Sequence, residues 1–182
     1  GFDGGTDEVN LVQGYWGAIG LKVNQELLER SLYEQRNDIG DVQVGVWTVD
    51  RSSVVKADPT RMLGTVADGP WGINYARWIR ANIYGETVVG TQTQPPEGHP
   101  LYRIHELWDQ TTKEPDEAKR NALFKELLDI HKEHPYQIGT LGEDPSPVIV
   151  KNNFFNVGAG FIVDDTLRGQ GLVVPAQFFI RG

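Results

Sequence analysis

The spacing of apolar residues changes from helical to strand-like and back within the first fifty positions. Between Val9 and Ile19 apolar residues recur at three- and four-residue steps, which is typical of an amphipathic helix. Gly20 stands where a helix end favours glycine, and the alternation that follows predicts a strand over 21–27. A second helix is expected over 28–39, and a second strand over 42–49.

The middle of the chain is predicted to be mainly helical and its last part mainly extended. Helices are expected over 71–84, 101–108 and 115–134, and short β segments over 136–141, 148–150 and 178–180. Pro115 and the two acids after it suit a helix start, and Pro135 stops the last helix. Helices alternating with strands predict an α/β fold, a mixed sheet with flanking helices.

Composition narrows the range of functions. The 182 residues suffice for one well-cored domain, or for a large domain with an appendage. A net charge of −8 and a pI near 5.0 argue against a nucleic-acid partner. Cysteine is absent, which excludes disulfides and thiolate metal sites, and no apolar window is long enough for a membrane helix.

Catalytic and metal-binding motifs are weak in this sequence. His131 and His134 lie three residues apart near a helix end, where the helix dipole favours histidine, and no third metal ligand is close in the sequence. No serine lies in a Gly-x-Ser-x-Gly turn, and neither a GxGxxG nor a Walker loop is present. We therefore expect no enzyme activity, no metal and no cofactor.

Aromatic residues are the better candidates for binding. The predicted strand over 42–49 delivers Trp47 and Asp50 to its C-terminal end, where open α/β sheets bind ligands. The rings of Trp71, Tyr75 and Trp78 follow, with Asn74 among them. Such a group suits stacking on a ligand combined with hydrogen bonding to it. The alternative is packing in the core, which is preferred for Trp16 and Trp108 and stays open for Trp71 and Trp78.

Several short motifs occur in an order that resembles a known family. They are Trp16–Val23 (W-x-x-I-G-L-x-V), Trp47–Asp50 followed by Asp58-Pro59, Trp71-Gly72 with Ala76–Trp78, Asp116–Leu123 (D-x-x-x-R-x-x-L), Ile138–Leu141, Asn156-Val157 and Pro175–Phe179. Together they resemble the C-terminal lobe of extracellular solute-binding proteins of the peptide/nickel type (family 5), which deliver solutes to ABC importers. The resemblance extends over nearly the whole chain.

This resemblance implies a C-terminal lobe of a two-lobed, periplasmic-binding-protein-like (type II) fold. Residues 1–142 would form the ligand-binding lobe, and 143–182 would return toward an N-terminal lobe that lies upstream with an export signal. The chain would then be a fragment of a periplasmic or extracellular protein. Its partners would be ABC permease subunits, and it would meet the membrane only through an anchor outside this chain, such as a lipid.

The resemblance also suggests what the site holds. In peptide-binding relatives the acid that matches Asp50 holds the terminal ammonium of the ligand, although the run 51–57 departs from that pattern. Because flat rings stack on sugar faces, an oligosaccharide is the alternative to an oligopeptide. A hydrolase domain is the alternative from another functional class.

Overall fold

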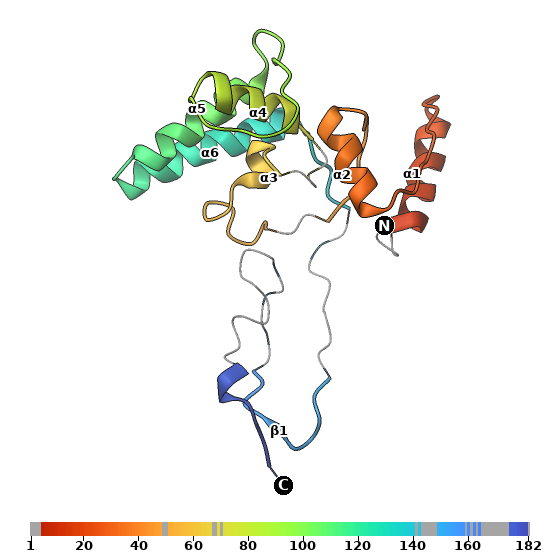
Figure 1. The fold of residues 1–182 in the computed structure, drawn as a ribbon, viewed down its shortest axis with the longest axis vertical. Coiled ribbons are helices and arrows are strands. Elements are labelled where there is room, and N and C mark those ends of the chain that lie inside the picture. Colours follow the sequence, from red (N-terminus) through yellow and green to blue (C-terminus); the bar gives the residue numbers. More distant parts are fainter. Residues whose placement is uncertain are drawn as a thin grey trace. The chain divides into compact units, whose positions relative to one another are not determined.

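In the computed structural model, residues 5–48, 51–66, 69, 71–140, 142, 149–158, 160, 162, 164 and 175–181 are described. The helices and strands of this part are α1 (Gly5–Ala18), α2 (Arg30–Ile39), α3 (Thr60–Leu63), α4 (Ile73–Asn82), α5 (Pro100–Lys113), α6 (Glu117–Glu133), β1 (Phe154–Phe155), a 3₁₀ turn (Pro175–Gln177) and β2 (Phe179–Ile180). The described chain is therefore mostly helical with a small sheet (Figure 1).

Backbone contacts divide the chain into two compact units. The first, here called the helical unit, comprises Gly1–Thr48 and Leu63–Gln137. The second, here called the strand unit, comprises Val49–Met62 and Ile138–Gly182. The chain thus leaves the helical unit after Thr48, returns to it at Leu63, and leaves it again after Gln137.

The core of the helical unit lies along α5. Leu101, Ile104 and Leu107 follow at three-residue steps and are fully buried. Figure 1 shows α5 and α6 side by side, and this is the most extensive helix pair of the described chain. From α6, Phe124 and Leu127 are buried as well, so the apolar stripes predicted for these two helices form one core.

Helix ends follow the local chemistry of the sequence. Asp116 is the N-cap of α6, and its carboxylate accepts a 2.9 Å hydrogen bond from the Lys119 amide. Gly40 ends α2 in the left-handed conformation (φ 80°), which favours glycine. The predicted helix ends at Gly20 and Pro135 agree with the structure, in which α1 ends at Ala18 and α6 at Glu133.

Helix α4 is joined to α2 through polar contacts. Arg77 of α4 forms an ion pair with Asp38 of α2, and both side chains are largely shielded from solvent. The buried Asn37 side chain donates a 2.9 Å hydrogen bond to the Gly69 carbonyl. On its other side α4 buries Ala76 and Ile79 completely.

The strand unit contains the β-sheet of the described chain. Strands β1 and β2 are antiparallel, with Phe155 opposite Phe179, and the two rings stack with centroids 5.3 Å apart. The carboxylate of Asp164 accepts hydrogen bonds from the Ser52 amide (3.0 Å) and from the Ser53 amide (3.1 Å) and hydroxyl (3.0 Å). This carboxylate ties the segment that interrupts the helical unit to the C-terminal part of the chain.

The predicted α/β class holds only coarsely, since the described residues combine helices with a two-stranded antiparallel sheet and the strands expected for a mixed sheet are not found among them. Residues 21–29 and 41–48 belong to no strand, nor do 136–140 and 149–150, whereas β2 lies within the expected segment 178–180. A strand needs a neighbouring backbone, and the apolar pattern does not supply one. The Val23 carbonyl instead accepts a 2.7 Å hydrogen bond from the side chain of Gln13.

Two further sequence predictions concern the termini and the membrane. The suggested return of 143–182 to an upstream lobe stays a prediction, because residues 143–148 and most of 159–174 lie outside the described ranges. Among the helices of the described chain, none combines the length and the apolar character needed to cross a membrane.

Candidate functional site

Three of the six predicted binding residues belong to one group of aromatic side chains. Trp71 lies just before α4, and Tyr75 and Trp78 lie one turn apart on it. Gly72 is the N-cap of α4 with φ 71°, a conformation that favours glycine and turns the chain between Trp71 and the helix.

The start of α5 brings two further rings to this group. His99 packs edge-on against Tyr75 with ring centroids 5.2 Å apart, and Tyr102 packs edge-on against Trp78 at 6.4 Å. Tyr75 and Trp78 are three residues apart, and so are His99 and Tyr102. The two ring pairs therefore lie one helical turn apart between α4 and α5. The Tyr102 hydroxyl donates a 3.1 Å hydrogen bond to the Pro95 carbonyl, which fixes that ring.

Tyr136 extends the group from the segment after α6. Its ring stacks on Trp71 at 4.5 Å and 3°, and it faces His99 at 6.0 Å and 21°. Trp71 is only 9% exposed, so it forms a buried base for Tyr136. The half-buried rings above it are here called the aromatic surface: Tyr75, Trp78, His99, Tyr102 and Tyr136.

The aromatic surface is uncharged at neutral pH. Partial burial, and then nearby His134, lower the pKa of His99 below its ordinary 6.5, which keeps the ring neutral. Burial raises the pKa of Tyr136, so this phenol also stays neutral. Neutral rings with polar edges suit stacking on a ligand face combined with hydrogen bonds at its rim.

The other predicted residues lie elsewhere. Trp47 stacks on Tyr33 of α2 at 5.0 Å, and the guanidinium of Arg30 lies 5.4 Å from the centre of the Trp47 ring. This is packing between the chain after α2 and the helix itself. Asp50 lies outside the described residues.

Asn74 is directed toward α2 rather than toward the aromatic surface. A Cβ at Gly40 would lie 3.1 Å from Nδ2 of Asn74, so this glycine makes room for the amide. The Oδ1 atom of Asn74 is buried without a hydrogen-bond partner. Its backbone carbonyl accepts a 3.1 Å hydrogen bond from the Thr93 amide, which holds the loop before α5 against α4.

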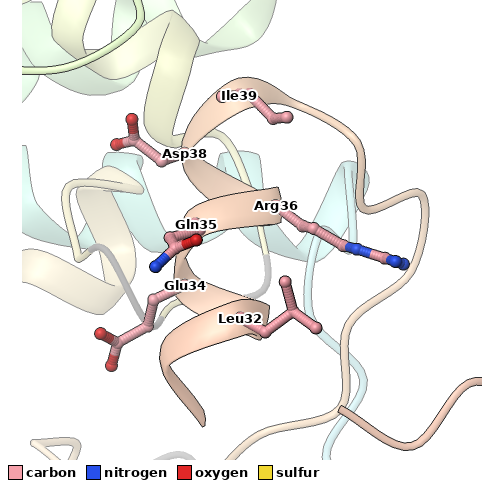
Figure 2. Close-up of a pocket in the computed structure, with 6 residues that line it drawn as sticks. All are labelled: Leu32, Glu34, Gln35, Arg36, Asp38 and Ile39. Carbon is pink, nitrogen blue, oxygen red and sulfur yellow. The ribbon is translucent and has the colours of Figure 1, made fainter. Parts of the chain in front are cut away.

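A shallow depression on α2 is not a convergent site. Its lining comes from this one helix: Leu32, Glu34, Gln35, Arg36, Asp38 and Ile39. Figure 2 shows that Leu32 and Arg36 point to one side of the helix, whereas Glu34 and Asp38 point to the other. Asp38 is already paired with Arg77, so the depression offers no set of groups directed at one ligand.

Sequence reasoning missed His99, Tyr102 and Tyr136. The pair His99-Pro100 carried one usable signal, because proline is frequent at the first position of a helix and the residue before it is then the N-cap. Tyr136 follows the proline that ends α6, where the chain must turn away from the helix axis. Neither proline shows which aromatic ring the side chain of His99 or Tyr136 contacts.

The described residues contain no cluster of side chains that could bind a metal ion. Within the described ranges, no three His, Asp or Glu side chains come together as a metal site requires, although His99 and His131 both contact Tyr136.

No protein-family model matches the chain, and no significant match is found among curated proteins or solved structures.

Proposed function

We propose that this chain is the C-terminal lobe of the substrate-binding component of an ABC importer, with a periplasmic-binding-protein-like (type II) fold. The aromatic surface would form part of one wall of a cleft that captures an extended solute, and a second lobe would supply the other wall. The protein would act by closing over its ligand rather than by chemistry. It would work in the periplasm or outside the cell and hand its ligand to permease subunits.

One observation carries this proposal. Three separate segments, the helix α4, the start of α5 and the residue after Pro135, bring five partly exposed aromatic rings together. The rings form two contacting sets, Tyr75 with His99 and Tyr136, and Trp78 with Tyr102. The exposed parts of these rings leave flat faces available to a ligand, whereas Ile79 and Leu101 of the same two helices are completely buried. The ordered motifs of the sequence support the same assignment to a solute-binding lobe.

Two solute classes remain, and the structure gives a reason to test both. An oligopeptide follows from the family resemblance and from the role suggested for Asp50. An oligosaccharide is favoured by the aromatic surface itself, because its rings are neutral and flat faces stack on sugar rings. The two classes differ in charge, since a peptide carries an ammonium and a sugar does not.

Binding to the chain joined to its N-terminal lobe tests this function. Thermal-shift screens against tri- to pentapeptides and against oligosaccharides should reveal stabilisation by one class. Trp78→Ala should then weaken binding about tenfold, the effect of losing one ring contact. Trp108→Ala is the matched control, because Trp108 packs on Phe124 of α6 and lies outside the aromatic surface. Stabilisation by neither class would refute the proposal.

A further inference from the structure

His99 is an unusual N-cap for α5. Its backbone is extended (φ −60°, ψ 130°), Pro100 occupies the first helical position, and Nδ1 accepts a 3.2 Å hydrogen bond from the Leu101 amide. The N-cap is ordinarily Ser, Thr, Asp or Asn. A histidine accepts at Nδ1 only when that nitrogen carries a lone pair, so the single ring proton belongs on Nε2.

The same ring also connects three segments of the helical unit. It packs on Tyr75 of α4 at 5.2 Å and on Tyr136 after α6 at 6.0 Å, while its own backbone begins α5. Two of the five rings of the aromatic surface are therefore held through His99. A change in this one side chain alters both the helix start and the surface.

Protonation of His99 is unfavourable for three separate reasons. It removes the lone pair that caps the Leu101 amide. It places a cation at the positive end of the α5 dipole. It also places a charge on a partly buried ring beside His134, and burial first and His134 second already lower the pKa of His99.

The neighbouring groups do not offset that charge. In the described structure, the titratable groups that face His99 are Tyr75 from α4, Tyr136 after α6, and His134 at the end of α6. No described carboxylate contributes to the pKa shift of His99. The neutral ring is the form that fits its surroundings.

We propose that His99 is a pH-dependent positioning residue of the aromatic surface. Its neutral form caps α5 and holds Tyr75 and Tyr136 in place, and its protonation releases both, so that solute capture weakens in mildly acidic surroundings. The part that concerns capture rests on the function proposed above. The part that concerns the helix start and the two rings is a property of the chain alone.

The direction of the pH effect follows from the pKa shift. Because the pKa of His99 is lowered on folding, its stabilising contribution is complete above the unfolded value of 6.5. That contribution is lost as the pH falls from 6.5 toward the lower folded value. His105 is a second titrating group of α5, but its pKa is about 4, so a titration from pH 8 to about 5 separates the two histidines.

NMR on the ligand-free chain tests the positioning role. The amide proton of Leu101 and the ring signals of Tyr75 and Tyr136 should shift together, with a midpoint below 6.5. In His99→Asn, which keeps a cap acceptor that does not titrate, the shifts of Leu101 and Tyr75 should disappear while the Leu101 amide stays protected. Tyr136 also contacts the rings of His131 and His134, so its signal is read as the difference between the wild type and this variant. In His99→Ala that amide should be unprotected at every pH. A Leu101 shift that persists in His99→Asn, or none in the wild type, would overturn the proposal.

Binding measurements then separate this inference from the function. Tri-alanine and cellotriose serve as probes at about pH 7.5 and about pH 5, two values on either side of an unperturbed histidine. The probe that binds at the higher pH should bind about tenfold more weakly at the lower one, and His99→Asn should remove that difference. Equal affinity at both values overturns pH-dependent capture and leaves the binding function standing. If neither these probes nor any member of the two ligand classes screened above binds at the higher pH, the function fails and capture control fails with it. The NMR result still decides the positioning role.

Discussion

The helical unit and the strand unit bury different kinds of side chain. The fully buried large residues of the helical unit include Ile79, Leu101, Ile104, Leu107 and Leu127. In the described part of the strand unit, the buried residues are Arg61 and Asp164, and both carry a charge. Apolar burial is additive and not directional, whereas a buried carboxylate stabilises only where its donors are correctly placed. The helical unit should therefore unfold cooperatively, and the strand unit should respond to changes locally.

Removal of core volume from the helical unit should have the largest effect. Leu107→Ala deletes a fully buried side chain of α5, which costs about 2–5 kcal/mol of unfolding free energy. Urea unfolding followed by circular dichroism measures this loss. The control is Leu128→Ala on α6, where the side chain is 38% exposed and the loss should stay below about 1 kcal/mol. Equal losses in the two variants would contradict the placement of the core along α5.

Acid should weaken the same core through His105. The Nε2–H of this buried side chain donates to the Leu63 carbonyl at 3.0 Å, and Nδ1 is buried without a partner, so a second ring proton has no acceptor. Burial lowers its pKa from 6.5 to about 4. Stability is thus complete above pH 6.5 and falls by about 3 kcal/mol as the pH drops to about 4.

Urea unfolding at a series of pH values checks this prediction. His105→Gln keeps an N–H group for the Leu63 carbonyl but does not titrate in this range, so it should flatten the pH dependence. An unchanged slope in this variant would assign the acid sensitivity to other groups.

Loss of a helix cap should have a smaller effect on the helical unit. Asp116→Ala removes the acceptor for the Lys119 amide and should cost about 1 kcal/mol. Asp116→Asn keeps an acceptor and should cost only a few tenths of that. Thermal unfolding of the two variants compares them directly, and equal melting temperatures would exclude capping as the role of Asp116.

The smallest global effect is expected in the strand unit. Asp164→Ala removes three hydrogen bonds to Ser52 and Ser53, so exchange of these two amides should become about tenfold faster. The urea midpoint of the helical unit should not change. Hydrogen exchange detected by NMR measures the first effect, and urea unfolding measures the second. Asp164→Asn, which keeps one acceptor, should exchange at a rate between those of the wild type and Asp164→Ala. A loss as large as that of Leu107→Ala would show that the two units share one cooperative core.

The site was predictable to the extent that its residues share one local segment. Trp71, Tyr75 and Trp78 were recognised because large rings lie within eight residues of sequence. Their partners His99, Tyr102 and Tyr136 come from later segments, and contacts between segments carry no local signature. Trp47 was expected at a strand end, but 41–48 forms no strand, and the ring stacks on Tyr33 of α2 instead.

The sequence by itself determined five of the described helices and several of their ends, although α3 was not expected and the helix predicted over 101–108 continues to Lys113. Apolar periodicity located α1, α2, α4, α5 and α6, and the caps at Gly40 and Asp116 follow from the conformational preferences of those residues. The tertiary structure decided the strands, the aromatic surface and the tautomer of His99. Helical hydrogen bonds close within one segment, so the sequence records them, whereas strand pairing and ring packing depend on which distant residues meet.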